Sequence, residues 1–318
     1  MAQFSWHINP GGYRWIEAIP KDQHHNPKAQ PQLFLTTRKE TPVQNWYDPL
    51  DQKKLFCEFA NTPPTKEGIL DFANEFGMLG WGSVLRYYFE TIREYIILNP
   101  SEAPRGQVTF VGGESLIAWI LAISVMHQVV TLWDMAQKQD VDGLSAHIQW
   151  DGNAILYDSH PELRPRATQR HCGSFSLLHD QENNPSGFRL TRRFTADEKQ
   201  REVFESGFPR AKLEGDVIHR ALYCVQSFVN EHLKEIMTRR LEWNSDSTAF
   251  VIHVDSGLSS LWDVLWYQFA ESIANKIEVA RKCVCPGCSV ILENPRANKD
   301  YCSNACRMKA YRKRLTYH

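Results

Sequence analysis

Five cysteines lie close together near the C-terminus of this 318-residue chain, and four of them have the spacing of a metal site. Cys285 and Cys288 are separated by two residues, and Cys302 and Cys306 follow as a second close pair. Two pairs of thiolates with this spacing can surround a zinc ion in a tetrahedron, with Zn–S distances of ~2.3 Å. We therefore predict a zinc site formed by Cys285, Cys288, Cys302 and Cys306, with Cys283 as the alternative to Cys285. Four sulfur ligands leave no open coordination position, so the predicted zinc is structural rather than hydrolytic.

The residues around these cysteines predict the local structure. Pro286-Gly287 suits a tight knuckle whose backbone N–H groups face the thiolates. Residues 289–301 are long enough for a short hairpin, and Ser303 can cap a helix that starts at Asn304. Knuckle, hairpin and helix together predict a treble-clef-like zinc module over 283–318, in which the metal replaces a hydrophobic core.

The predicted C-terminal helix is basic. Its cations are Arg307, Lys309, Arg312, Lys313 and Arg314. Residues 281–318 hold nine Lys/Arg and two acids, a net charge of +7, so that the first 280 residues carry −8 of the chain's total of −1. Such cations can neutralise phosphate groups, and arginine can read guanine edges, so we predict nucleic-acid binding, with DNA favoured. The alternative is a structural or protein-interaction module that binds no nucleic acid, because cations also favour the end of any exposed helix.

This region resembles a known group of proteins. Residues 257–314 look like the C-terminal part of uncharacterised bacterial proteins, in which a helix of the type Leu265-Trp266-Tyr267-Gln268-Phe269 precedes the knuckle and the run YCSNACRMKAYRKR ends the module. The stretch is also similar to the CGNR zinc fingers of bacterial transcription regulators that are thought to respond to stress. Cys306-Arg307-Met308-Lys309 stands where that family has Cys-Gly-Asn-Arg. The resemblance implies a DNA-binding finger attached to a helical sensor domain, and no enzymatic activity.

Upstream of the zinc module, the sequence predicts a mainly helical body with small β additions, an α+β fold. Apolar residues at three- and four-residue steps predict helices over 65–77, 81–96, 114–137, 216–242 and 260–282. Thr65 and Ser260 are the expected N-caps of the first and last of these helices. The last helix meets Cys283 without a Gly or Pro, which predicts a fixed attachment of the module. The apolar run 116–126 is too short to span a bilayer, so we expect a buried helix and no membrane association.

Strands are expected in smaller number. We predict a hairpin around Pro10-Gly12, a strand at 108–111, a hairpin at 145–157 that turns at Asp151-Gly152, and a strand at 249–254. The polar segment 159–215 is interpreted as a long loop with short elements or as a linker. The expected organisation is an irregular or β-rich segment 1–64 packed on the body, a helical body 65–282, and the zinc module 283–318.

The region 145–180 is rich in ionisable side chains but lacks a catalytic motif. The candidates are His147, Asp151, Asp158, His160, Glu162, His171, Cys172, His179 and Asp180. Their spacing matches no zinc-protease, nucleophile-elbow or phosphate-loop pattern, so we predict no catalytic site. An enzyme would require a cleft that gathers several of these groups with shifted pKa values.

Composition and cysteine usage indicate the compartment. The chain is 42% hydrophobic and 23% charged, which is typical of a soluble globular protein. The first residues have neither a basic start nor an apolar stretch, so no signal peptide is expected, and we predict a cytoplasmic protein. Tryptophans on the predicted helices form either the core or the lining of a cavity for a small molecule; they are Trp119, Trp133, Trp262 and Trp266.

Overall fold

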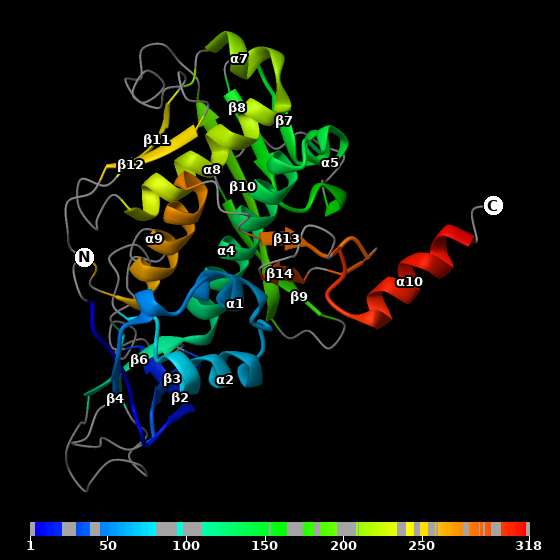
Figure 1. Ribbon diagram of the computed structural model, residues 1–318. Coiled ribbons are helices and arrows are strands. Elements are labelled where there is room, and N and C mark those ends of the chain that lie inside the picture. Colours follow the sequence, from blue (N-terminus) through cyan, green and yellow to red (C-terminus); the bar gives the residue numbers. More distant parts are fainter. Residues whose placement is uncertain are drawn as a thin grey trace, which may run out of the picture.

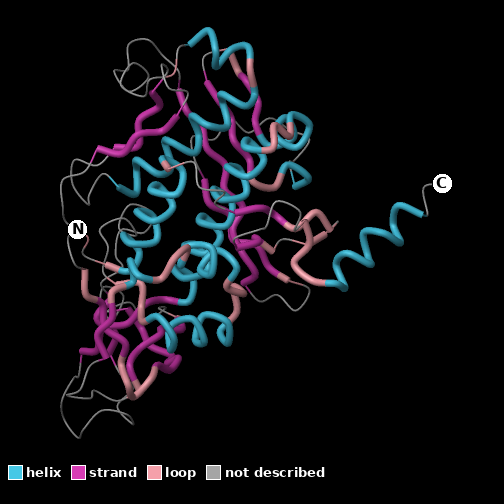
Figure 2. The backbone as a smooth tube through the Cα atoms, in the orientation of Figure 1, coloured by secondary structure: helices cyan, strands magenta, loops and turns pink. Residues whose placement is uncertain are grey.

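The computed structural model has an α+β fold, as the sequence predicts, with helices at the centre and small sheets around them (Figures 1 and 2). The structure describes the chain outside 1–3, 21–29, 39–44, 81–93, 98–109, 153, 164–173, 181–184, 196–207, 209, 234–239, 245–248, 254–257, 259, 276–279, 286, 289, 294–299 and 316–318.

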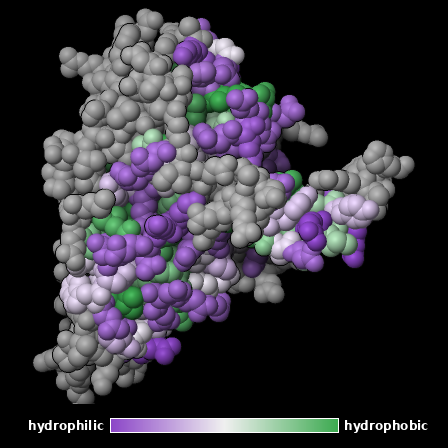
Figure 3. All heavy atoms as spheres, viewed as in Figure 1, coloured by the Kyte–Doolittle hydropathy of each residue, from purple (hydrophilic) through white to green (hydrophobic). Residues whose placement is uncertain are grey.

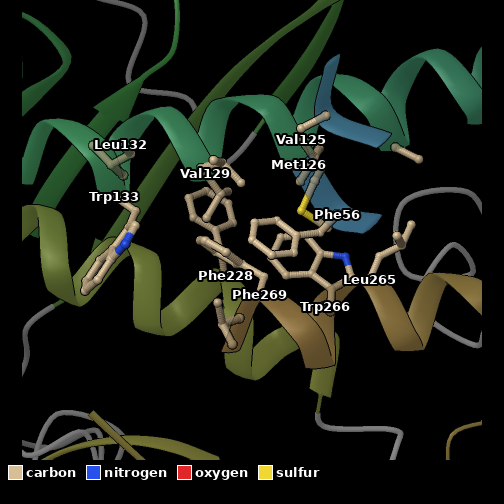
Figure 4. Close-up of a cluster of buried hydrophobic side chains, with 14 of the residues drawn as sticks. Phe56, Val125, Met126, Val129, Leu132, Trp133, Phe228, Leu265, Trp266 and Phe269 are labelled. Carbon is tan, nitrogen blue, oxygen red and sulfur yellow. The ribbon is translucent and has the colours of Figure 1, made fainter. Parts of the chain in front are cut away.

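The central element is α4 (Leu116–Gln137), which is apolar nearly all round and packs between other elements on several sides. It contacts α1 (Leu55–Asn61) and α8 (Val217–Leu233), and α9 (Leu261–Ala274) packs against both of these. Figure 4 shows Met126, Phe228 and Phe269 converging from three of these helices into one cluster. α4 is long and apolar enough to cross a membrane, but 78% of its most apolar window is buried inside the protein. The apolar run therefore forms the core.

The tryptophans of these helices belong to that core. Trp119, Trp262 and Trp266 are almost fully buried, and the rings of Trp262 and Trp266 meet edge to face with their centroids 5.6 Å apart. Trp133, on α4, is buried in the same cluster. The structure thus gives these side chains a packing role, and a cavity for a small molecule stays a prediction.

The helix caps follow the sequence closely. Thr65 Oγ1 accepts a hydrogen bond from the N–H of Gly68 at the start of α2 (Lys66–Phe76). Ser260 Oγ accepts one from the N–H of Asp263 at the start of α9. Both caps satisfy backbone donors that a helix N-terminus leaves without a partner. These two predictions are confirmed.

The N-terminal β structure differs from the prediction. Strands β2 (Tyr13–Pro20), β3 (Gln32–Thr37), β5 (Glu94–Ile97) and β6 (Phe110–Ser115) form a small closed barrel, whereas β1 (Trp6–Ile8) pairs with β4 (Asn45–Tyr47). The turn before β2 is present, since the N–H of Gly12 donates to the carbonyl of Asn9 over 2.8 Å. However, β1 pairs with β4, whereas β2 pairs with β3 and β5. The strands on the two sides of this turn therefore belong to different sheets, and the predicted hairpin is wrong.

Two predicted helices end differently in the structure. Tyr95 and Ile96 pair with β6 in the barrel, so the C-terminal end of the predicted helix 81–96 is a strand, while 81–93 lies outside the described residues. α8 ends at Leu233, and β11 (Arg240–Asn244) forms a ladder with β12 (Ala249–His253). In both cases a partner strand distant in sequence supplies backbone hydrogen bonds that local periodicity cannot anticipate.

The segment 159–215 contributes strands rather than loop alone. The predicted hairpin at 145–157 is confirmed from residue 148 on, as β7 (Ile148–Trp150) and β8 (Ala154–Asp158), whereas 145–147 are helical. β9 (Ser174–His179) and β10 (Pro185–Thr195) complete a four-stranded sheet. Phe188, Leu190 and Phe194 on β10 are buried, which is the period of two expected for a strand with one face on the core. Short elements complete the body: α5 (Val141–His147), α7 (Arg210–Gly215), and single 3-10 turns at Pro49–Asp51 and Pro161–Leu163.

Candidate metal centre

The cysteine-rich segment begins with a two-stranded hairpin. β13 (Ala280–Lys282) pairs with β14 (Ile291–Glu293), so that residues 283–290 form the loop at its tip. β14 thus pairs with a strand that precedes the knuckle. The turn of the hairpin predicted within 289–301 lies outside the described residues, at 294–299, so that hairpin stays a prediction. The prediction that α9 continues to Cys283 is wrong, since α9 ends at Ala274 and its cap, Asn275, donates its N–H to the carbonyl of Glu271.

The loop at the tip is a tight turn. The N–H of Cys288 donates to the carbonyl of Cys285 over 3.0 Å, and Gly287 takes a left-handed conformation with φ of 77°. A side chain at this position would strain the backbone, which accounts for a glycine here. The N–H of Cys283 donates to the carbonyl of Val290 over 2.9 Å and closes the loop. Three cysteines are thereby held within one short turn.

Four sulfur atoms come together beside this turn. The Sγ atoms of Cys283, Cys288, Cys302 and Cys306 all lie within 4.8 Å of one another. Cys302 Sγ is 3.7 Å from Cys288 Sγ and 3.4 Å from Cys306 Sγ. Four sulfurs placed tetrahedrally at ~2.3 Å from a zinc ion are ~3.8 Å apart, so the donor set and its spacing fit zinc. The set includes Cys283, the alternative ligand of the sequence analysis, rather than Cys285.

Backbone and hydroxyl groups support these sulfurs. The N–H of Cys302 donates to Cys283 Sγ over 3.4 Å, a contact that stabilises charge on the sulfur. Ser303 Oγ accepts the N–H of Cys306 over 3.2 Å, so Ser303 caps α10 (Asn304–Leu315). The cap and the start of the helix at Asn304 are both as predicted. Cys306 consequently lies in the first turn of α10, where the helix dipole favours a thiolate.

The thiols influence one another's ionisation. Hydrogen bonds from Cys302 and Ser303 lower the pKa of Cys306 to about 7. Burial, followed by the contact with Cys306, raises the pKa of Cys302 to about 12. The thiols of the cluster therefore ionise as a coupled set. Zinc must displace the remaining thiol protons, so its affinity for the cluster rises with pH.

Cys285 lies beside the four-sulfur set. Its side chain is only 3% exposed and makes a thiol hydrogen bond with Cys306. Burial raises the pKa of Cys285, and the nearby ammonium of Lys309 opposes this rise. Lys309 Nζ reaches to within 3.9 Å of the position that a Cβ on Gly287 would take, which places this cation against the knuckle. The module thus contains a fifth sulfur in contact with the centre.

Two polar side chains of the body fix the hairpin in place. Asn61, at the end of α1, donates its side-chain N–H to the carbonyl of Ile291 and accepts the N–H of Ile291, each over 2.8 Å. Asp134 on α4 is buried and accepts the N–H of Lys282 over 2.8 Å. Ile291 itself is buried in the main core. The module is therefore held against α1 and α4, and no pattern in the sequence marked Asn61 or Asp134 for this role.

The basic helix α10 projects away from the rest of the molecule (red in Figure 1). Arg307, Lys309, Arg312 and Lys313 are exposed along it, and Arg314 lies in its last turn. Figure 3 shows that polar and less polar atoms alternate on the described part of this projection. Its less polar groups are Met308, which is 42% exposed, and Tyr311, which is 57% exposed.

Most ionisable residues of the region 145–180 are engaged with one another or with the backbone. The Asp158 carboxylate accepts two hydrogen bonds from Arg189, at 3.0 and 2.7 Å, and the N–H of His160. His147 Nδ1 lies 2.8 Å from the carbonyl of Asp158, and Asp151 forms an ion pair with Arg193. These contacts join β8, β10 and α5, which gives the cluster a structural role.

Glu162, in the 3-10 turn after β8, lies close enough to this cluster for its carboxylate to raise the pKa of Arg189. His179 and Asp180 lie apart from it and are exposed at the end of β9. His171 and Cys172 lie outside the described residues. Within the part of the chain that the structure describes, the four cysteines are the only group of His, Cys, Asp and Glu arranged to hold a metal ion.

Compared with known proteins, the chain matches no protein-family model, no curated protein and no solved structure. The cysteine cluster and the basic helix that follows it are the features of the described residues that point to a function.

Proposed function

We propose that this chain is a cytoplasmic bacterial zinc protein, that the zinc is structural, and that α10 binds nucleic acid, DNA in preference, in the service of transcription regulation. The observation that carries the proposal is the position of the exposed cations of α10 on a helix that projects from the body and begins at the four-cysteine cluster.

The charge distribution supports a polyanionic partner. The segment after Cys302 contains no acidic residue, whereas the first 280 residues have a net charge of −8. An acidic body repels a phosphate backbone, so a basic helix that stands away from it offers the better approach. An α-helix also fits the width of the DNA major groove. In this arrangement the arginines and lysines of α10 contact phosphates.

The metal would give this helix its direction. Cys302 precedes α10 and Cys306 lies in its first turn, so a zinc ion bound to both fixes the start of the helix relative to the hairpin. Asn61 and Asp134 in turn fix the hairpin relative to the body. Zinc has a positioning role here and takes no part in chemistry.

A second candidate function is protein interaction without nucleic acid. Among the described residues, six large hydrophobic side chains are exposed, and four of them belong to the zinc module: Val284, Val290, Met308 and Tyr311. Exposed apolar groups of this kind are characteristic of protein contacts. The two candidates differ in their response to salt, because apolar contacts do not weaken as salt rises.

The test is a fluorescence anisotropy titration with a labelled random-sequence DNA duplex. We expect binding that weakens steeply between about 50 and 200 mM salt, and a smaller slope for the double variant Arg307→Gln/Arg312→Gln. Lys53→Gln, an exposed cation on the body, is the matched control and should bind as the unchanged protein does. If no salt-sensitive binding appears at low ionic strength, or if the control weakens binding equally, the nucleic-acid function is rejected.

A further inference from the structure

The cysteine module contains one sulfur more than a tetrahedral metal ion accepts. Four Sγ atoms form the candidate site, and Cys285 lies outside that set but hydrogen-bonds to one of its members, Cys306. The turn that carries Cys285 is held by the hydrogen bond from the N–H of Cys288 to the Cys285 carbonyl. Cys285 is thus fixed next to a candidate zinc ligand.

The other described cysteines outside the module are in a different environment. Cys57 on α1 and Cys224 on α8 are fully buried among the apolar side chains of the main core. Cys285, in contrast, lies in the short loop 283–290 with two other cysteines, and its neighbour Cys306 is partly exposed. Packing in the main core accounts for Cys57 and Cys224. Cys285 does not belong to that core cluster, so packing there does not explain its presence.

We propose that Cys285 and Cys306 form an oxidisable pair, and that a peroxide converts them to a disulfide and so releases the metal ion. The proposal rests on the zinc site and is independent of whether α10 binds nucleic acid.

The chemistry needs two thiols and one peroxide molecule. The sulfur of Cys306, the more exposed of the two, attacks the peroxide; the O–O bond breaks, and Cys306 becomes a sulfenic acid while hydroxide leaves. The Cys285 sulfur then attacks the Cys306 sulfur, an S–S bond forms, and the sulfenic oxygen leaves as water with the proton of the Cys285 thiol. Two electrons pass from the two sulfurs to the peroxide.

The fifth sulfur makes this route more direct than pairing between two ligands. If Cys302 captured the sulfenic acid, a second metal–sulfur bond would have to break first. Cys285 can capture it while Cys283, Cys288 and Cys302 still hold the ion. The disulfide then leaves three sulfur ligands, and the first turn of α10 is drawn toward the knuckle.

The test uses the full-length, zinc-loaded protein treated with hydrogen peroxide, with zinc release followed by a metallochromic chelator. We expect loss of zinc from the unchanged protein, a disulfide between Cys285 and Cys306 in peptide mass spectrometry, and recovery after reduction with added zinc. Cys285→Ser should bind zinc in the same ratio and release it at least about tenfold more slowly. Cys57→Ala, which removes a thiol from the core, is the control and should release zinc at the unchanged rate.

Several results would overturn the proposal. One is an oxidised protein in which Cys306 pairs with Cys302; another is equal release from Cys285→Ser and the unchanged protein. Loss of zinc from untreated Cys285→Ser would identify Cys285 as a ligand instead of the partner in oxidation. Because the disulfide is mapped in the unchanged protein, the test does not depend on the stability of any variant.

Discussion

The body and the zinc module of this chain are stabilised in different ways. The body buries large aromatic side chains from α1, α4, α8 and α9 in one continuous cluster (Figure 4). The module buries few apolar groups, chiefly Ile291, Leu292 and Ala310, and gathers four sulfur atoms instead. Apolar burial contributes about 25 cal/mol per Å², which a segment of this size cannot supply in quantity. We therefore expect the module, unlike the body, to depend on a bound metal ion for its stability.

Removal of zinc should have the largest effect, and only on the module. Binding of structural zinc contributes about 10 kcal/mol or more to small zinc domains, so chelation or Cys302→Ser should unfold residues 283–315. Hydrogen exchange should show lost protection in α10 and retained protection in α4 and α8. Simultaneous loss of protection in α4 would contradict the division into two separately stabilised regions.

A cavity in the core should affect the body and not the metal. Phe269 on α9 is fully buried against Phe56, with ring centroids 5.3 Å apart. Phe269→Ala should lower the free energy of unfolding by about 3–5 kcal/mol, measured by urea denaturation. Zinc content should remain that of the unchanged protein, and a variant that loses zinc would show that the two regions fold as one unit.

The body should also respond to pH through a buried carboxyl group that the module lacks. Glu114 accepts the N–H groups of Leu79 and Gly80, but burial dominates and raises its pKa from 4.5 to about 7. The folded state then binds the proton more tightly than the unfolded chain. This raised pKa contributes roughly 3 kcal/mol to the free energy of unfolding. The contribution is fully present below about pH 4.5 and is lost as the pH rises through about 7.

Glu114→Gln should remove this part of the pH dependence of the unfolding free energy. Glu67→Gln, which changes an exposed acid on α2, is the control and should retain it. A pH profile that is unchanged by Glu114→Gln would show that another group is responsible.

The contact between the two regions should be the weakest of these features. Asn61→Ala removes both hydrogen bonds to Ile291 and leaves two backbone groups without partners, at about 1–3 kcal/mol. Lys138→Ala removes an ion pair with Asp134 in which the lysine is 37% exposed, and a long hydrogen bond of 3.5 Å to the carbonyl of Lys282, at about 0–1 kcal/mol. Hydrogen exchange of β14 should increase for Asn61→Ala and change little for Lys138→Ala; the opposite order would reject the assignment of Asn61 as the main anchor.

Local features of the fold could be predicted from the sequence because their causes are local. The caps at Thr65, Ser260 and Ser303 depend on a hydroxyl within three residues of the N–H that it accepts. The same holds for the turn between β7 and β8 and for the apolar helix α4. Spacing also predicts the four-sulfur cluster as a candidate metal site, since two close pairs of thiols within one short segment are typical of zinc binding.

The remaining features depend on partners distant in sequence. The sequence predicts helix for most of β5 and for the first residues of β11, because their apolar spacing fits either structure until a neighbouring strand is known. The choice between Cys283 and Cys285 is of the same kind. It depends on the pairing of Cys283 with Val290 and on the N–H of Cys302, which reaches Cys283 Sγ from 19 residues away. The spacing of the cysteines in the knuckle predicts neither of these two contacts.

The zinc content of three proteins, measured by native mass spectrometry, shows whether Cys283, Cys288, Cys302 and Cys306 bind a metal ion. We expect one zinc ion per chain for the unchanged protein and for Cys285→Ser, and none for Cys283→Ser. An unchanged protein without zinc would rule out the proposed metal centre. So would zinc that persists in Cys283→Ser but is absent from Cys285→Ser.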